Sequence, residues 1–272
     1  MPELPEVERA RRRLEAAVAG RSIVFVDVLH ANVARRVSRR TLASLAGVEI
    51  VGVARRGKHQ LIRLQDGRTV HAHFRMTGDW HIDRETEPLP RFARAVMVLD
   101  DGSRVVLDDP RALSTLDVHP AGSEPDLGLG PEPTDPTFTV AHLRNALAGR
   151  RGPIKPVLLD QRVVAGLGNI YAVEALWLAR IAPTAIARAL DDRDLVRLRS
   201  AIIRVIARAS GARYRESASR FAVYDRDDQR CRRCGSSIKR ILQSGRSTYY
   251  CPGCQLAGRR ARVSRGPRSG RP

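Results

Sequence analysis

All four cysteines of the chain lie between residues 231 and 254. They form two Cys-x2-Cys pairs separated by sixteen residues: Cys231 and Cys234, then Cys251 and Cys254. Four thiolates at this spacing are typical of one tetrahedral zinc site, because each pair supplies two sulfur atoms from one tight turn. Two disulfides are the alternative, which a reducing compartment disfavours. We therefore predict a β-hairpin zinc finger over residues 225–258, with one structural zinc that has no open position for catalysis.

The charge of the chain indicates a polyanionic partner. Its 272 residues contain 48 Lys and Arg against 29 Asp and Glu, which gives a net charge of +19. Such a charge repels itself, and binding to nucleic acid is the usual reason for it. An arginine-rich composition also follows from a GC-rich genome. Charge and finger alone would equally suit an RNA-binding or ribosome-associated zinc protein.

No feature of the sequence indicates a membrane or an export route. No stretch approaches the roughly 20 apolar residues of a membrane span. The N-terminal segment lacks the basic and then apolar order of a secretory signal. We therefore expect a cytoplasmic protein without a membrane partner.

The hydrophobic period divides the chain into a β-rich part and a helical part. Residues 5–18 predict a helix, with proline in the first turn and Gly20 just after the end. Short β-branched runs follow from residue 22 to residue 118, some separated by Asp-Gly turns such as Asp66-Gly67. These runs predict antiparallel hairpins in a sandwich or barrel. Residues 2–119 are thus expected to form one domain of a helix and a β-sandwich.

Five prolines and three glycines in residues 120–136 indicate a linker. Residues 137–224 then show helical periodicity in four segments and predict a helical domain. The finger at 225–258 follows, and residues 259–272 form a basic tail without acidic residues. The predicted fold class is α+β and multidomain.

The first residues after the initiator methionine carry a chemical possibility. Removal of Met1 would leave Pro2 with a free secondary amine, which can condense with a masked aldehyde to give an iminium. An α-amino group titrates near pH 8, so a useful fraction is neutral at physiological pH. Read alone, this proline is better explained as the lead-in to a helix.

Several motifs in order change that interpretation. MPELPEVE, RRGKH, DPRALS, GLGNIYAVEAL and the paired Cys-x2-Cys finger closely resemble the bacterial formamidopyrimidine-DNA glycosylase family, the Fpg/Nei group. The resemblance runs from Pro2 to Gln255. It implies an N-terminal helix with a β-sandwich, a helix-two-turn-helix domain and a zinc finger, in the order that periodicity predicts. PELPEVE resembles the formamidopyrimidine branch more than the endonuclease VIII branch.

The resemblance also implies the catalytic residues. Pro2 would attack C1′ of a damaged nucleotide, expel the base and cleave the strand by β,δ-elimination. Glu3 would transfer protons at the sugar, and Lys58 would lie against the phosphate or the lesion. For Glu6, a functional role and a dipole partner at the helix N-terminus are equally good interpretations.

The DNA contacts implied by the resemblance fall on three kinds of site. Met76 would fill the space left by the everted base, Arg111 would face the orphaned base, and Leu113 would be the wedge. Glu174 would orient the N-terminal segment or be a solvated helical residue. Phosphate contacts are expected from the following residues: Lys155, Asn169 and Arg246.

The chain departs from the family in two places. Leu113 stands where most of the formamidopyrimidine branch has phenylalanine, and the connection before the finger lacks the glycine- and threonine-rich loop that caps 8-oxoguanine in typical members. Oxidised purines are the first expected substrates of this DNA glycosylase and AP lyase. The enzyme is expected to act as a monomer on damaged duplex DNA. An endonuclease VIII-like enzyme for oxidised pyrimidines and a non-catalytic DNA-binding zinc-finger protein are the alternatives.

Overall fold

The structure is a computed structural model that describes residues 2–210 and 221–255. Within these ranges the chain forms two compact units. Unit 1 contains residues 2–135, 160–168 and 206–210, and unit 2 contains residues 136–159, 169–205 and 221–255. The chain therefore leaves unit 1 after residue 135 and returns to it for residues 160–168. No helix in the described ranges combines the length and the apolar composition that a bilayer crossing requires.

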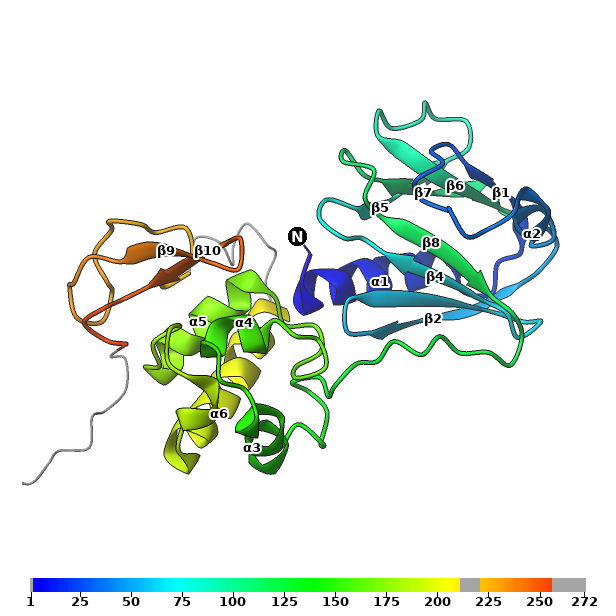
Figure 1. The fold of residues 1–272 in the computed structure, drawn as a ribbon. Helices are drawn as coiled ribbons and strands as arrows, with labels where there is room; N and C mark the ends of the chain where they lie inside the picture. The colour runs from blue at the N-terminus through cyan, green and yellow to red at the C-terminus, as the bar shows by residue number, and fades with distance from the viewer. Residues whose placement is uncertain (1, 211–220, 256–272) are drawn as a thin grey trace, which may run out of the picture. The chain divides into compact units, whose positions relative to one another are not determined.

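Unit 1 begins with helix α1 (Leu4–Val18), drawn in dark blue in Figure 1. A capping box fixes its start, because the side chains of Glu3 and Glu6 each accept from the backbone N–H of the other residue. Pro5 lies in the first turn, where its missing N–H costs no hydrogen bond. The buried residues recur at helical spacing, so one face of α1 is apolar. The helix predicted over residues 5–18 is confirmed.

Two four-stranded antiparallel sheets make up most of unit 1 (Figure 1). The first has the order β1-β6-β7-β5 and consists of β1 (Ile23–Val28), β5 (Asp79–Arg84), β6 (Ala93–Leu99) and β7 (Ser103–Asp108). The second has the order β2-β3-β4-β8 and consists of β2 (Ile50–Arg56), β3 (His59–Leu64), β4 (Thr69–His73) and β8 (Thr115–His119). A short helix, α2 (Arg39–Ala43), lies between β1 and β2 in the sequence.

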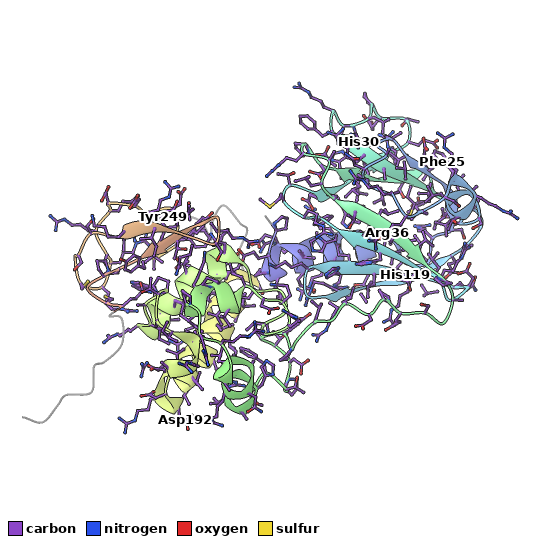
Figure 2. All side chains as sticks on the ribbon, in the orientation of Figure 1. Phe25, His30, Arg36, His119, Asp192 and Tyr249 are labelled. Atoms are coloured by element: carbon purple, nitrogen blue, oxygen red, sulfur yellow. The ribbon has the colours of Figure 1, made fainter. Side chains whose placement is uncertain are left out.

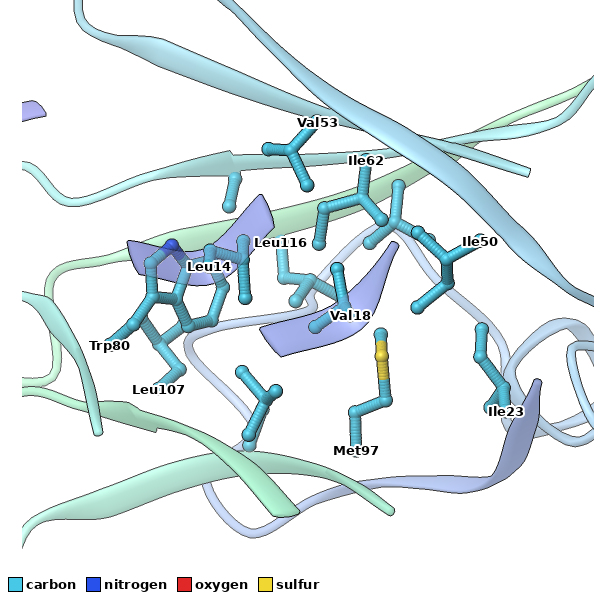
Figure 3. Close-up of a cluster of buried hydrophobic side chains, with 14 of the residues drawn as sticks. Leu14, Val18, Ile23, Ile50, Val53, Ile62, Trp80, Met97, Leu107 and Leu116 are labelled. Atoms are coloured by element: carbon cyan, nitrogen blue, oxygen red, sulfur yellow. The ribbon is translucent and has the colours of Figure 1, made fainter. Parts of the chain in front are cut away.

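One hydrophobic core joins α1 to both sheets. Figure 3 shows Leu14 and Val18 of α1 among side chains such as Ile62 of β3 and Met97 of β6. Each of these side chains is at least 95% buried. Full burial of one such side chain contributes about 1.5–3 kcal/mol. The core therefore anchors α1 and, through it, the residues that precede the helix.

Strands β5 and β8 and helix α2 are not predicted by the sequence pattern. Each of the two strands lies at an edge of its sheet. Their segments, DWHIDR and TLDVH, contain charged residues, and Trp80 and Leu116 are their buried residues. An edge strand with one buried side chain gives little periodic signal, whereas the inner strands have apolar runs.

Unit 2 contains the helices predicted between residues 137 and 210. The four predicted helices are α3 (Val140–Ala148), α4 (Ile154–Leu158), α5 (Asn169–Ala179) and α6 (Asp192–Ser210), whose last residues belong to unit 1. A short 3-10 helix that was not predicted, η1 (Ala187–Ala189), lies between α5 and α6 in the sequence. Helix α5 is apolar on nearly all sides and almost fully buried. Such a helix forms the centre of a packed domain rather than its surface.

The predicted finger hairpin is confirmed. Strand β9 (Lys239–Gln243) pairs antiparallel with β10 (Arg246–Tyr250), and Figure 2 labels Tyr249 on β10. Ser244 and Gly245 connect the strands with φ of 49° and 71°, as a two-residue hairpin turn requires. The hairpin packs in a small core that contains Val173, Cys251 and Tyr249.

The α+β fold class, with an N-terminal helix and sandwich, a helical part and a C-terminal hairpin, is confirmed. The exact domain boundaries stay a prediction. Three expectations concern residues outside the described ranges: the removal of Met1, the missing capping loop at 211–220 and the basic tail at 259–272.

Candidate functional site

Pro2 borders a hollow in unit 1 with a volume of about 610 Å³. Three arginines of α1 line the same hollow: Arg9, Arg12 and Arg13. Glu6 and Thr77 complete part of its wall. The charged lining of the hollow thus combines three arginines with the carboxylates of Glu6 and Asp79.

Three consecutive residues, 166–168, hold the N-terminal segment and Lys58; we call them the clasp. The carbonyl of residue 166 accepts from the Leu4 N–H at 3.1 Å. The carbonyl of residue 167 accepts from Lys58 Nζ at 3.0 Å. The N–H of residue 168 donates to Glu3 Oε2 at 2.7 Å. All of these residues belong to unit 1, so the structure brings the predicted Glu3 and Lys58 to one short segment.

Both glycines of the clasp are required by close approach. A Cβ atom on Gly168 would lie 2.3 Å from Glu3 Cδ, and one on Gly166 would lie 2.4 Å from Leu4 Cδ1. Gly166 also has a φ of +82°, a conformation that side chains rarely adopt. The Gln161 side chain braces the clasp by accepting from the Gly166 N–H and donating to the Leu167 carbonyl. The GLG of the sequence motif is therefore a contact surface for Glu3.

Glu3 and Glu6 have different surroundings. Glu3 is 1% exposed, and its backbone N–H donates to Glu6 Oε2 at 3.0 Å. The other carboxylate oxygen of Glu6 accepts from Arg9 Nη2 at 3.2 Å. Glu6 thus serves as the capping partner of α1, which was one of its two predicted roles. A contact of Glu6 with DNA stays a prediction.

A buried ion pair positions the turn before Lys58. Arg55 binds both carboxylate oxygens of Glu132 at 2.8 and 2.9 Å, and Glu132 also accepts from the Gly57 N–H at 2.6 Å. Gly57 has a φ of 58°. Because the turn is held at both backbone and side chain, the Lys58 ammonium can reach the clasp. The sequence analysis missed Glu132, since it lies in the predicted linker.

Glu8 extends this network on α1. Burial would raise the pKa of its carboxyl group, but hydrogen bonds from Arg11, Arg55 and Arg12 outweigh burial and lower the pKa to about 2. Burial would likewise lower the pKa of Arg55, and its two carboxylate partners, Glu132 and Glu8, raise it instead. Glu8 and Arg55 are therefore both charged at neutral pH.

Three residues of unit 1 are predicted to enter the duplex where the damaged base leaves it, and we call them the probe residues: Met76, Arg111 and Leu113. They lie on two loops and reach solvent. Met76 is 40% exposed and Leu113 is 42% exposed, and Arg111 is also exposed. Met76 is thus not part of the core. An exposed methionine and an exposed leucine on loops are available to enter a base stack.

A row of histidines runs across β3, β4 and β8 beside Lys58. His59 Nδ1 lies 2.8 Å from His71 Nε2, and His71 Nδ1 lies 3.3 Å from His119 Nε2. Figure 2 labels His119 at the end of this row. The ring of His73 lies 4.5 Å from that of His59. Burial and neighbouring positive groups lower the pKa of His59 to about 4 and that of His73 to about 3.

These shifts predict that the protein loses stability as the pH falls. In the unfolded chain a histidine takes up its proton near pH 6.5, whereas folded His59 and His73 do so only near pH 4 and 3. The free energy of unfolding should therefore decrease from about pH 6.5 down to about pH 4, by on the order of 2 kcal/mol after allowance for partial solvent exposure. Guanidinium unfolding at several pH values measures it.

A double variant, His59→Asn with His73→Asn, should flatten this pH dependence. The control is His30→Asn, which replaces a half-exposed histidine outside the row (Figure 2). Equal slopes for the wild type and the double variant would contradict the assignment.

In unit 2, three predicted phosphate contacts converge on β10. Asn169, the first residue of α5, donates through Nδ2 to the Ser247 carbonyl at 3.0 Å. Lys155 of α4 donates through Nζ to Thr248 Oγ1 at 2.9 Å. Arg246 begins β10 and is exposed. Lys155 is 0% exposed and supports β10 through its contact with Thr248. A contact of Lys155 with a phosphate stays a prediction.

Burial of Glu174 excludes one of the two roles considered for it, and its orienting of the N-terminal segment stays a prediction. It is 7% exposed, so the solvated alternative is wrong. Its carboxylate accepts from three successive backbone N–H groups, those of residues 222–224, at 2.8–2.9 Å. Burial raises the pKa of Glu174, while these donors favour the charged form. Its carboxylate thus holds the segment that leads to the finger.

The four cysteines are placed to hold one metal ion. Their Sγ atoms all lie within 4.8 Å of one another. Cys231 and Cys254 are 3.8 Å apart, and Cys234 and Cys251 are 3.4 Å apart. Four sulfurs at about 2.3 Å from a tetrahedral zinc lie about 3.8 Å apart. The donor set and its spacing therefore fit a structural zinc, as predicted.

Comparison with protein families gives three matches along the chain. Residues 1–116 match the formamidopyrimidine-DNA glycosylase N-terminal domain, and residues 129–219 match the H2TH domain of the same enzyme. Residues 228–257 match a zinc finger found in FPG and IleRS. Together these matches cover most of the chain.

Individual proteins agree with the family matches. Formamidopyrimidine-DNA glycosylases from Rhizorhabdus wittichii and Heliobacterium modesticaldum are each 39% identical to the chain, over 94% of it and 100% of their own length. A Lactococcus lactis Fpg structure, non-covalently bound to DNA with an AP site, superimposes with a TM-score of 0.88 at 30% identity, over 93% of this chain and 99% of that one. A structure of MutM in complex with DNA containing carbocyclic 8-oxo-G gives 0.87 at 31%, over 94% and 100%. The chain belongs to the formamidopyrimidine-DNA glycosylase family.

Proposed function

We propose that this chain is a bifunctional DNA glycosylase and AP lyase of base excision repair, which removes oxidised purines such as 8-oxoguanine and formamidopyrimidines. The observation that carries the proposal is the clasp, which holds Glu3 and Lys58 next to the segment that begins with Pro2. Family membership supports it, since relatives carry the name formamidopyrimidine-DNA glycosylase and a similar structure holds DNA with carbocyclic 8-oxo-G.

The nucleophile is the secondary amine of Pro2 after removal of Met1. Its lone pair forms a bond to C1′, and the glycosidic bond breaks with its electrons on the departing base. The nitrogen then forms a double bond to C1′ as the C1′–O4′ bond opens, which gives an iminium. Loss of a C2′ proton expels the 3′ phosphate, and a second elimination expels the 5′ phosphate.

The residues around Pro2 suit this chemistry. An α-amine has a pKa near 8, so a useful fraction of it is neutral at physiological pH. Glu3 is the proton donor for O4′, and positioned proton transfer contributes roughly 10²–10⁴-fold to rate. Lys58 binds the phosphate next to the lesion.

Chemistry at C1′ requires the damaged nucleotide to leave the stack. Met76 and Leu113 enter the space it leaves, and Arg111 faces the orphaned base. Asn169 and Arg246 bind the backbone phosphates together with β10, which the buried Lys155 supports. Binding of a monomer to duplex DNA is then dominated by phosphate contacts and weakens steeply with salt. With chromosomal DNA as its substrate, the protein works at the bacterial nucleoid in the cytoplasm.

Leu113 favours a second candidate substrate class. Leucine is a shorter wedge than phenylalanine and cannot stack on a base. Oxidised pyrimidines, as for endonuclease VIII, and hydantoins therefore belong in any substrate test. A non-catalytic DNA-binding role is the remaining alternative, and the presence of Pro2, Glu3 and Lys58 argues against it.

Borohydride trapping tests the proposal. Duplexes with 8-oxoguanine, an oxidised pyrimidine or an abasic site are incubated with the protein and borohydride, and the adduct peptide is identified by mass spectrometry. We expect an adduct at Pro2, with most adduct from the preferred lesion. An intact mass that shows Met1 removed, together with no adduct on any duplex, would leave a DNA-binding protein without this chemistry.

A further inference from the structure

Two loops of unit 1 carry the probe residues, and both have unusual backbone. Residues 74–78 carry Met76, and residues 109–114 carry Arg111 and Leu113. Arg75 and Ala112 have φ of 54° and 50°, which non-glycine residues rarely adopt. Each lies directly beside a probe residue. A left-handed conformation of this kind persists only where surrounding contacts hold it.

Asp109 supplies those contacts in the second loop. It is 0% exposed. Its carboxylate accepts from the backbone N–H groups of Arg111 at 3.1 Å, Leu113 at 2.8 Å and Ser114 at 2.8 Å. The loop therefore folds around this one side chain, which fixes the directions in which Arg111 and Leu113 leave the backbone.

The same carboxylate reaches the first loop. Thr77 donates its hydroxyl to Asp109 Oδ1, one residue after Met76. A second contact lies beside it, because Ser114 Oγ is 2.8 Å from Asp109 Oδ2 and 3.1 Å from the Phe74 carbonyl. The loops are pressed together here, since a Cβ on Gly78 would lie 2.3 Å from Ser114 Oγ. Thr77 also lines the hollow of Pro2.

We propose that Asp109 is a positioning residue that couples the two loops, so that Met76, Arg111 and Leu113 enter the duplex as one rigid unit. This inference rests on the proposed function, because it assigns a task to the residues that replace the everted base. The carboxylate touches neither the substrate nor the reacting atoms. Its effect is on the step that precedes chemistry, and Thr77 is the link between the loops.

The test separates eversion from chemistry with two variants. Thr77→Val keeps the side-chain shape and removes the hydroxyl that links the loops. Asp109→Asn keeps the shape and replaces one acceptor oxygen by a donor. Eversion is followed by stopped-flow fluorescence of 2-aminopurine placed next to a stable abasic analogue in a duplex. Chemistry is followed by borohydride trapping on a single-stranded abasic oligonucleotide, which has no partner base to displace.

We expect each variant to evert about tenfold more slowly or worse, as loss of a hydrogen bond to a charged group implies. Trapping by Asp109→Asn on single-stranded DNA should stay within about twofold of the wild type, since Asp109 does not line the hollow of Pro2. Adding Met76→Ala to Thr77→Val should slow eversion no further than either change alone. Both changes disrupt the same rigid unit, so their effects on the rate are not additive. A merely structural defect would add to the effect of Met76→Ala.

Asp83→Asn is the matched control. Asp83 is also a mostly buried carboxylate of unit 1, but it pairs with Arg104 at 2.8 Å, away from both loops. The coupling would be overturned if Thr77→Val everted the nucleotide at the wild-type rate. It would also be overturned if the effects of Thr77→Val and Met76→Ala on the eversion rate were additive. A wild type that everts the nucleotide but gives no adduct would instead overturn the proposed chemistry and leave the coupling standing. A wild type that does neither would overturn both.

Discussion

Replacing Gly168 by alanine will lower base excision by about a hundredfold or more, while binding to duplex DNA changes by a few fold at most. The added Cβ would lie 2.3 Å from Glu3 Cδ, and the Glu3 carboxylate is the group that the Gly168 N–H holds. The carboxylate must therefore move by an ångström or so, and a displacement of that size at a proton donor costs about 10²-fold in rate. Single-turnover excision and fluorescence anisotropy measure the two quantities.

Gly152→Ala provides the control, because a Cβ at Gly152 meets no atom within 4 Å and its φ is not in the left-handed region. Excision by this variant should equal that of the wild type. If Gly168→Ala also excised at the wild-type rate, Glu3 would not be the proton donor in the position that the clasp gives it. Glu3→Gln then separates proton transfer from positioning, since it keeps the shape of the side chain.

Removing the zinc will abolish tight binding to every duplex, damaged or not. Metal binding to a four-cysteine unit contributes on the order of 10 kcal/mol to its folding. Cys231 and Cys251 are part of the small core in which Tyr249 packs. Loss of the metal therefore unfolds β9 and β10, and Arg246 loses its place beside Asn169 and Lys155. We expect duplex affinity to fall by about 10²-fold or more.

Metal content by atomic emission and duplex affinity by anisotropy, before and after dialysis against a chelator, give the result. Zinc returned to the dialysed protein should restore binding, and magnesium should not, because magnesium prefers oxygen ligands. Full duplex affinity in a protein shown to contain no zinc would contradict a structural role for the metal. Cys251→Ser should reproduce the chelated state.

The sequence predicts the residues that act locally better than those that act across the chain. The zinc ligands, the start of α1 and the helix that opens at Asn169 follow from spacing, capping and period, and the structure confirms each of these elements. The roles of Asp109, Glu132 and Glu174 depend on which backbone groups approach their carboxylates. Glu132 accepts a hydrogen bond from the backbone N–H of Gly57, which lies 75 residues away in the sequence. No period or motif records such a contact.

Burial of polar residues was the other limit. Lys155 is expected from the sequence to contact a phosphate, yet it is fully buried against Thr248. Strands β5 and β8 resemble polar loops in the sequence, because only one side chain in each strand is fully buried. In both cases tertiary packing overrides the local pattern. A sequence can therefore indicate the chemistry of this site more readily than the scaffold that aligns it.

The clasp also has a consequence for the order of synthesis. Glu3 and the N–H that holds it are separated by 165 residues. At roughly 5–20 residues per second, a ribosome needs on the order of ten seconds to make that stretch. A nascent chain thus exposes its N-terminal segment well before the backbone group that positions Glu3 has been made. Under the proposed mechanism, the strand-cutting site is complete only after the second half of the polypeptide has been synthesised.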